Sequence, residues 1–332
     1  MARRKQATFA SGGFDVYRRA SRRARFLAEI DRIMPWEELM AIVEPYYPKT
    51  GQRGRPVTPL EWMIKLYFIQ IWFGLSDPQT EDIIHDSYAV EKFLGLDLGR
   101  DRPPDETTIL RFRHLIEEHK LGPKLLAVVN AHLEKAGVRV RTGTVVDATV
   151  IEAPRSRKNA SGERDPEMGS TKKGNQWYFG AKLHVGVDSQ TKVIHSVEMT
   201  AAHVHDSQVV GKLLHGKERR VYGDKAYVGQ EEAIRARAPQ ARNFIERRAA
   251  KNHPLSDEEE RRNRRKAAIR SRVEHVFGVI KHIFGWRKVR FKGIAKNLQY
   301  AYGVAAAVNI YLHRRTLGKL FGGGSELPLG VS

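Results

Sequence analysis

The chain of 332 residues contains no cysteine, which excludes disulfide bonds and thiolate metal sites. It also lacks a long apolar run. The longest, residues 62–75, is interrupted by Lys65 and Gln70 and is shorter than the roughly 20 residues that span a bilayer, so it predicts a buried helix. The first residues, Met1 to Lys5, have no apolar signal core. These absences predict a cytoplasmic protein that is not embedded in a membrane.

Acidic residues are scarce relative to basic ones, with 38 Asp and Glu against 58 Lys and Arg and a net charge of +20. A surplus of this size indicates a polyanionic partner, because each neutralised phosphate releases counterions and strengthens binding. The glycine-rich phosphate loop of nucleoside triphosphatases is missing, which disfavours helicases and ATPases. Nucleic acid is therefore the expected partner, ahead of an anionic membrane surface.

The positive charge is concentrated in two segments. Residues 1–26 hold eight Lys or Arg and one acid, and residues 242–296 hold seventeen Lys or Arg and six acids. The first segment suits an arm that grips phosphate, or alternatively a solubilising tail. The length allows two domains, each with its own core. We expect a basic arm with the first helices over 1–55, a helical domain over 56–138, a catalytic domain over 139–318 and a flexible tail over 319–332.

Residues 56–138 carry the start and stop signals of a series of helices. The start signals are Thr58 with Pro59, Ser76 and Asp105, and the stop signals are Gly74, Gly95 and Gly137. The helix that follows Asp105 has apolar residues at helical spacing and should expose four polar ones, Thr107, Thr108, Arg111 and Arg113. Such a helix could contact DNA as helix-turn-helix proteins do. A dimerising or supporting bundle is an equally good interpretation.

From Gly143 onwards the pattern changes to strands, rich in Val, Ile and Thr. The expected order is three strands, a helix, a strand, a helix, a strand and a long basic helix from about Glu259 to Phe284. This is the order of a ribonuclease H-like α/β domain with a mixed five-stranded sheet, here preceded by an all-α domain. The segment 154–176 is basic and rich in Gly, Ser and Asn, which predicts a long mobile loop. The strands are expected at 144–152, 177–187, 192–199, 219–222 and 243–246.

Two aspartates are candidates for a metal site. Asp147 interrupts an apolar strand, where a charged group costs several kcal/mol unless it is paired or ligates a metal. Asp224 follows a second apolar strand. If the two strands lie side by side, their carboxyl ends meet at a topological switch point and the two acids converge. Taken alone, an Asp after a strand is more often a cap, and Asp188 and Asp206 are interpreted as a hairpin turn and a helix cap.

Glu274 is the third candidate. At ~100° per residue it shares a stripe with Arg270 and Lys281 at the border of the helix's apolar face. It could therefore ligate a metal while its cationic neighbours hold phosphates, although a simple surface pair with Arg270 is an equal alternative. Phosphodiester transfer uses two Mg²⁺ ions roughly 4 Å apart, held by carboxylates. The pair His203 and His205 lacks a third ligand, so no zinc site is expected there.

In its motifs the sequence resembles bacterial insertion-sequence transposases of the insertion sequence 5 family, from Phe26 to about Arg315. The N-terminal matches include residues 46–49, 74–77 and 105–113. The C-terminal matches include Val146-Asp147-Ala148-Thr149, residues 172–177, His205-Asp206, residues 223–227 and the spacing Arg270-x3-Glu274-x6-Lys281.

The resemblance implies a ribonuclease H-like DDE transposase that cuts and joins DNA with Asp147, Asp224 and Glu274 as a metal-binding triad. It also implies Mg²⁺ dependence, with Mn²⁺ as a substitute, and binding of the element's terminal inverted repeats as a dimer or higher oligomer. In a bacterial cell such a protein would associate with the nucleoid. A nuclease or resolvase without strand transfer, and a DNA-binding regulator without chemistry, remain alternatives. The lysines and arginines expected to contact DNA from these motifs are Arg270, Lys281, Lys172, Lys173, Lys182 and Lys225.

Overall fold

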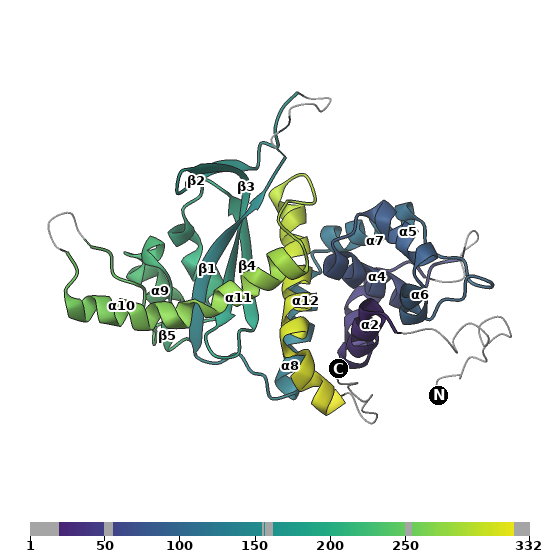
Figure 1. Cartoon of the computed structure of the whole chain (residues 1–332), viewed down its shortest axis with the longest axis horizontal. Helices are drawn as coiled ribbons and strands as arrows, with labels where there is room; N and C mark the ends of the chain where they lie inside the picture. The colour runs from purple at the N-terminus through teal and green to yellow at the C-terminus, as the bar shows by residue number, and fades with distance from the viewer. Residues whose placement is uncertain (1–19, 50–55, 155, 157–161, 250–253, 322–332) are drawn as a thin grey trace.

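The computed structural model describes residues 20–49, 56–154, 156, 162–249 and 254–321. Most of the predicted basic arm, the centre of the predicted loop and the end of the predicted tail lie outside the described residues. Within residues 20–135 the chain forms helices, which gather to one side of the sheet (Figure 1). These are α2 (Arg22–Ile33), α3 (Trp36–Val43), η1 (Glu44–Tyr46), α4 (Leu60–Phe73), α5 (Asp77–Asp86), α6 (Tyr88–Leu94), α7 (Glu106–Glu118) and α8 (Gly122–Lys135).

The helix boundaries follow local capping chemistry. Ser76 forms a full capping box at the start of α5, and the Asp105 side chain accepts a hydrogen bond from a backbone N–H in the first turn of α7. Gly74 ends α4 with φ of 65°, a conformation that favours glycine. The prediction of Thr58 as a cap was wrong. Pro59 occupies the N-cap position of α4, without a side-chain bond.

The sheet is mixed and has six strands within the described residues, so the prediction of five was one too few. Residues 144–152 of β1 pair antiparallel with residues 180–188 of β3. Strand β3 also pairs with β2 and β4, and β5 runs parallel to β1 and to β6. The added strand, β2, lies inside the segment predicted as a loop, because the chain turns at Gly174 and pairs β2 with the start of β3. The strands are β1 (Gly143–Glu152), β2 (Gly169–Lys173), β3 (Gln176–Asp188), β4 (Ile194–Ala201), β5 (Arg220–Tyr222) and β6 (Arg242–Asn243).

The helices that follow the sheet strands differ from the prediction in form. The expected helix after β4 is a 3₁₀ helix, η2 (Asp206–Leu213), and the short η3 (Lys225–Tyr227) and α9 (Glu231–Arg237) follow β5. The long basic helix is divided into α10 (Asp257–Arg270) and α11 (Arg272–Gly278), with a π-helical turn at η4 (Val279–Ile283). The sequence interpretation did not include the longest helix, α12 (Ile294–Phe321).

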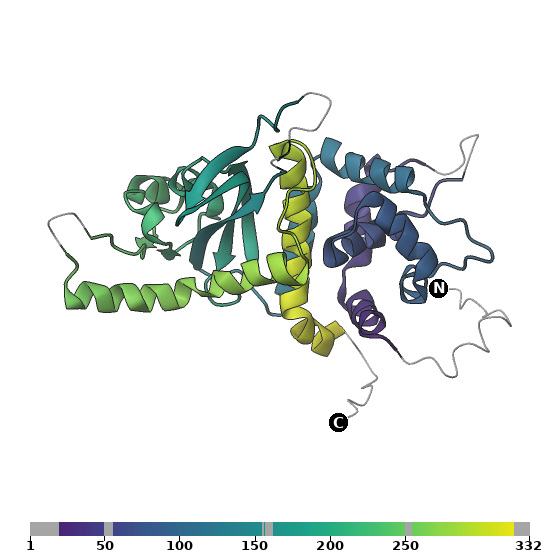
Figure 2. The same cartoon turned by 45° about the horizontal axis from the view of Figure 1, so that its top comes forward.

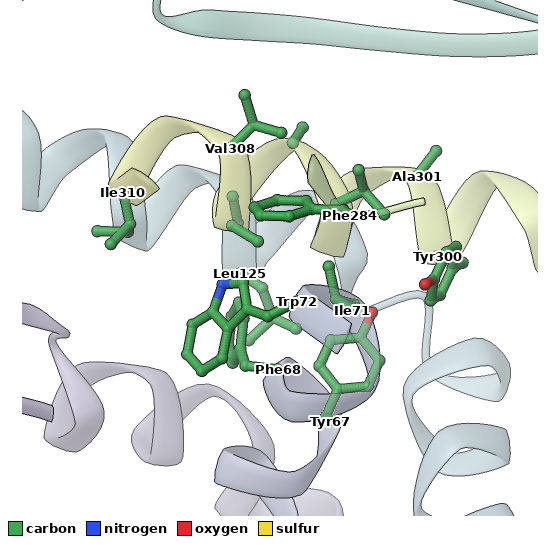
Figure 3. Packing of buried hydrophobic residues seen from close by; sticks show 14 of the residues in the cluster. Tyr67, Phe68, Ile71, Trp72, Leu125, Phe284, Tyr300, Ala301, Val308 and Ile310 are labelled. Atoms are coloured by element: carbon green, nitrogen blue, oxygen red, sulfur yellow. The ribbon is translucent and has the colours of Figure 1, made fainter. Parts of the chain in front are cut away.

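Helix α12 lies between the sheet and the N-terminal helices (Figure 2). It packs against β4, α8, α2 and α4, and α8 also contacts β4. Ten successive residues of α4, 63–72, are buried, including the two polar ones that interrupt its apolar run. Tyr67, Phe68, Ile71 and Trp72 of α4 lie next to Phe284 and to α12 residues such as Tyr300 (Figure 3). One hydrophobic core therefore runs from the N-terminal helices into the sheet.

A smaller core lies on the other face of the sheet. Val146 of β1 and Val221 of β5 pack there against η2 and α9. The sheet is thus covered on both faces, which buries the strands that lead to Asp147 and Asp224. None of the described helices is long and apolar enough to cross a membrane.

Gly303 of α12 allows this helix to approach α4 closely. A Cβ atom at this position would lie inside van der Waals contact of the Tyr67 ring. We expect Gly303→Ala to lower the free energy of unfolding by about 1–3 kcal/mol because of overpacking. This loss should outweigh the higher helix propensity of alanine, which favours a helix over glycine by about 1 kcal/mol. Denaturant unfolding measures the change.

The matched second variant is Tyr67→Phe. The Tyr67 hydroxyl is buried without a hydrogen-bond partner among the described residues, so its removal should cost little alone and should recover part of the stability lost in Gly303→Ala. Equal or higher stability of Gly303→Ala than of the original chain would contradict the close approach.

Candidate metal and DNA site

Two aspartates meet where β1 and β5 run parallel. The register pairs Val145 with Tyr222, so continuing it by two residues brings Asp147 next to Asp224 on the same face. Asp147 lies within β1, which continues to Glu152. Asp224 follows β5 and caps η3 by accepting a hydrogen bond from Ala226 N at 2.9 Å. The two acids lie just beyond the paired stretch of β1 and β5, at the carboxyl end of β5, as expected for a switch point.

Arg270, at the end of α10, links the carboxylates of this site. Its guanidinium is 3.3 Å from Asp147 Oδ2 and 3.1 Å from Glu246 Oε1. A third nitrogen lies 4.0 Å from Glu274 Oε1. The guanidinium of Arg270 therefore bridges acids from β1, from the segment after β6 and from α11. Its positive charge offsets the negative charge that these acids bring together.

The environment of Asp147 makes its ionisation costly. Its side chain is 16% exposed, and burial raises its pKa to about 6. The hydrogen bond from Ala148 N and the charge of Arg270 oppose this rise, while the nearby carboxylates of Asp224 and Asp206 add to it. A buried acid in this state gains from a metal ion that stabilises its charged form.

This shift predicts how the stability of the metal-free protein depends on pH. Because the pKa of Asp147 is raised from 3.8 to about 6, the folded protein binds the proton more tightly than the unfolded chain. Stability should therefore increase as pH falls from about 6 to 4, by at most about 3 kcal/mol from this group. Asp147→Asn should flatten the dependence and stabilise the protein at pH 7. Thermal unfolding in chelator between pH 4 and 8 tests this, and an unchanged pH profile in Asp147→Asn would contradict it.

Glu274 and Lys281 lie on different elements. Glu274, on α11, has a side chain that is 63% exposed and faces Arg270. Lys281 lies in the π-helical turn, and its amine donates to Val150 O at 2.7 Å. Burial lowers the pKa of Lys281, with Lys173 adding to the effect. Glu274 is thus open to a ligand, whereas Lys281 borders β1 with its amine already hydrogen-bonded.

Sequence reasoning missed two further acids. Asp206 was interpreted as a helix cap, but His205 is the N-cap of η2 and the Asp206 carboxylate lies 2.9 Å from Lys182 Nζ. Its charge also contributes to the raised pKa of Asp147. The second acid is Glu246, whose N–H donates to Gly223 O and so extends the pairing of β6 beyond its end. The signal was available, because an acid after a parallel strand next to β5 belongs to the same edge of the sheet.

The donor set fits a hard divalent cation. Carboxylate oxygens from Asp147 and Asp224 converge from neighbouring strands, and Mg²⁺ and Mn²⁺ prefer such oxygen ligands. The hydroxyl of Tyr227 is buried without a hydrogen-bond partner among the described residues, and the pKa of this phenol is raised by burial and then by the charges of Asp206, Asp147 and Asp224. A cation among these acids would relieve their mutual repulsion.

The side chains predicted to contact DNA divide into those that are exposed and those whose polar groups are already bonded within the protein. Lys172 and Lys173 are exposed on β2, Lys225 is exposed beside Asp224, and Thr107 and Arg111 are exposed on α7. The hydroxyl of Thr108, by contrast, donates to Asp105 within the helix cap.

Two of the predicted DNA contacts are corrected by the structure. Arg113 is 8% exposed, because its guanidinium pairs with Asp77 and Glu117 and lies over the Phe291 ring. Lys182 is almost buried and pairs with an acid of η2. The partners Asp77 of Arg113 and Asp206 of Lys182 come from distant segments, so the sequence spacing did not reveal them.

The chain matches two protein families and is similar to a solved structure. Residues 139–310 match the family described as "Transposase DDE domain", and residues 14–115 match a family described as "Transposase domain (DUF772)". The solved structure is a cryo-EM structure of the piggyBac transposase synaptic complex with hairpin DNA, at 10% identity and a TM-score of 0.45. The match covers 91% of this chain and 77% of that one.

Proposed function

Because the chain belongs to the family of DDE-domain transposases, we propose that it cuts and joins DNA strands with Asp147, Asp224 and Glu274 as its metal-binding triad. The insertion-sequence type is supported by both family matches, neither of which distinguishes the insertion sequence 5 family. The observation that carries the proposal is the register of β1 and β5, which brings two partly buried aspartates together at the carboxyl end of parallel strands.

Enzymes of this family generally depend on divalent metal ions, and two Mg²⁺ ions would here activate the attacking oxygen and stabilise the leaving one. The chain's own residues would hold and orient these two ions. Asp147 is fixed by Ala148 N and faces Asp224, while Glu274 approaches from α11. Arg270 neutralises these acids in the metal-free protein. A metal ion held by Asp147 would take over the neutralisation of this acid, and the planar guanidinium of Arg270 would then be able to fork across phosphate oxygens.

The substrate we propose is double-stranded DNA, specifically the terminal inverted repeats of the mobile element that encodes the chain. Exposed cations lie on η3, which begins directly after Asp224, and on β2, which pairs with the same strand, β3, as β1 does. The exposed residues Thr107 and Arg111 of α7 are candidates for contacts in a groove. A dimer or larger assembly would hold two DNA ends together.

A strand-joining assay separates this function from its alternatives. Protein and Mg²⁺ are incubated with a labelled duplex that carries the repeat from the DNA flanking the reading frame, together with a plasmid target. A transposase yields a joined product. A cut product alone indicates a nuclease or resolvase, and a protein–DNA complex without cutting indicates a regulator; either result would contradict the proposal.

The hairpin of β2 and β3 gives a prediction on DNA binding. Trp177 is 59% exposed and pairs across the hairpin with Lys172, so an aromatic ring and a cation stand together near the tip. Stacking on a base contributes about 1–3 kcal/mol, so Trp177→Ala should weaken binding of the DNA end by roughly tenfold or more, while Trp177→Phe keeps most of the affinity. Fluorescence anisotropy measures both.

Salt dependence distinguishes the two kinds of contact. Lys172→Ala should reduce the slope of log affinity against log salt by about one, whereas Trp177→Ala should leave the slope nearly unchanged. Equal affinity of Trp177→Ala and the original chain would remove the hairpin from the DNA interface.

A further inference from the structure

Away from the acidic site, three side chains of metal-ligating type converge on a second position. His195 lies near the start of β4, and His215 and Glu218 lie in the loop between η2 and β5. One ligand atom from each residue lies within 4.8 Å of the other two. The two imidazole rings are 4.9 Å apart at an angle of 81°, and His215 Nε2 is 3.3 Å from Glu218 Oε1.

We propose that His195, His215 and Glu218 bind one divalent transition-metal ion, with zinc as the best match. Two imidazoles and one carboxylate are an established ligand set for zinc, which leaves a fourth position for water. Imidazole also favours zinc, cobalt or nickel over Mg²⁺, so this site differs in chemistry from the all-oxygen site at Asp147.

Burial and charge support the proposal. Glu218 is 1% exposed, and a buried carboxylate is costly unless it is paired or binds a metal. Its oxygens accept hydrogen bonds from His215 N, Gly216 N and the Thr144 hydroxyl, but among the described residues no lysine or arginine pairs with it. The Nε2 atom of His215 is buried and makes no hydrogen bond within the part of the chain described. A cation placed between these atoms would satisfy both groups.

The His195 ring is held ready for such an ion. Its Nδ1 lies 2.9 Å from the Ser196 hydroxyl and its Nε2 lies 3.1 Å from the Thr144 hydroxyl. With metal on Nε2, the ring proton moves to Nδ1 and can be donated to Ser196, which is the outer hydrogen bond that orients a ligating histidine. Thr144 keeps its bond to Glu218. Burial lowers the pKa of His195 to about 3, so the ring is neutral.

Metal binding would break two hydrogen bonds and have one structural consequence. The first bond, between His195 Nε2 and the Thr144 hydroxyl, would give way to the bond from Nε2 to the metal. The Lys217 N–H donates to His215 Nδ1 at 3.2 Å, and this exposed bond must open when that nitrogen takes the ring proton. In return the ion would join β4 to the loop that leads directly into β5. Since β5 ends two residues before Asp224, the ion would stabilise the strand that places this acid.

An entry path for the ion is present. His195 also lines a cavity of about 560 Å³ between α8, β4 and α12, together with Asn130, Lys212 and Tyr302. Solvent can therefore reach the ring through this cavity.

The test is a cobalt titration of the metal-free full-length chain carrying Asp147→Asn, which weakens the acidic site. Four-coordinate Co²⁺ with nitrogen ligands absorbs visible light strongly, whereas octahedral Co²⁺ bound by oxygen does not. We expect one strongly absorbing ion per chain, displaced by Zn²⁺, and a higher melting temperature with Zn²⁺. His215→Gln should lose at least about 100-fold in affinity, since even outer-shell changes cost 10–100-fold.

His203→Gln is the matched control, because His203 is exposed, lies outside the cluster and should leave the absorption unchanged. Circular dichroism of metal-free His215→Gln checks that the fold is retained. His195→Gln provides a second variant should that check fail. Absence of the strong absorption in the parent chain, its persistence in both cluster variants, or its loss in His203→Gln would overturn the proposal.

Discussion

Asp147→Asn is expected to lower DNA cleavage and joining by at least about 10³-fold while binding of the DNA end is retained. The substitution would remove a charge that we propose holds the metal. Metal ions supply several kcal/mol of transition-state stabilisation, and about 1.4 kcal/mol corresponds to a tenfold change in rate. The exposed cations that attract DNA are unchanged. Asp224→Asn and Glu274→Gln should behave in the same way. The strand-joining assay measures the activity and anisotropy measures the binding.

Asp257→Asn is the matched control for this series. Asp257 is an exposed acid in the first turn of α10, within the same basic segment as Arg270. Its neutralisation changes the net charge by the same amount without touching the site, so joining should stay within a few-fold of the original rate. Substantial joining by any one of the three site variants would remove that residue from the triad.

Deletion of α12 is expected to abolish cooperative folding of the N-terminal helices as well as of the sheet. This helix buries thirteen residues and contacts both parts of the chain. Asn309 also bonds both the N–H and the C=O of Ile194 at the start of β4. Without α12, the buried face of α4 would be exposed over several large side chains, each worth about 1.5–3 kcal/mol when buried. That total exceeds the stability of a typical domain.

A chain ending at residue 293 provides the measurement. Its thermal unfolding by circular dichroism should show no cooperative transition, and a fragment of residues 1–137 should behave likewise. The control is a chain ending at residue 321, which keeps α12 and should unfold with an unchanged midpoint. A cooperative transition in the fragment 1–137 would contradict the continuous core and indicate an independent helical domain.

How much the sequence predicts can be judged from particular residues. Asp147 and Asp224 could be paired in advance because a charged residue in an apolar strand is rare and parallel strands end at the same edge. The caps at Ser76 and Asp105 could also be predicted, because a capping signal depends only on residues that are close in the sequence. By contrast, the middle of α12, residues 297–310, is buried on nearly all sides, so it lacks the alternation of polar and apolar residues that reveals a surface helix.

Long-range pairing explains the remaining errors. Arg113 looked exposed by spacing because its partner Asp77 lies on another helix. Lys182 looked available because Asp206 was interpreted as a cap. The sequence predicted one long helix here, whereas the structure divides it into α10 and α11 at Ser271. A sequence pattern indicates which residues are unusual, and only the fold shows which charges neutralise each other.

The central claim is that Asp147, Asp224 and Glu274 together hold two divalent ions. Its most direct test is Mn²⁺ binding to the complex of the full chain with a DNA end, followed by electron paramagnetic resonance. Two ions roughly 4 Å apart should give a spin-coupled spectrum, with two Mn²⁺ per chain, and the coupling should be lost in Asp147→Asn. A single uncoupled ion, or a coupled pair that persists in Asp147→Asn, would contradict the assignment of these carboxylates.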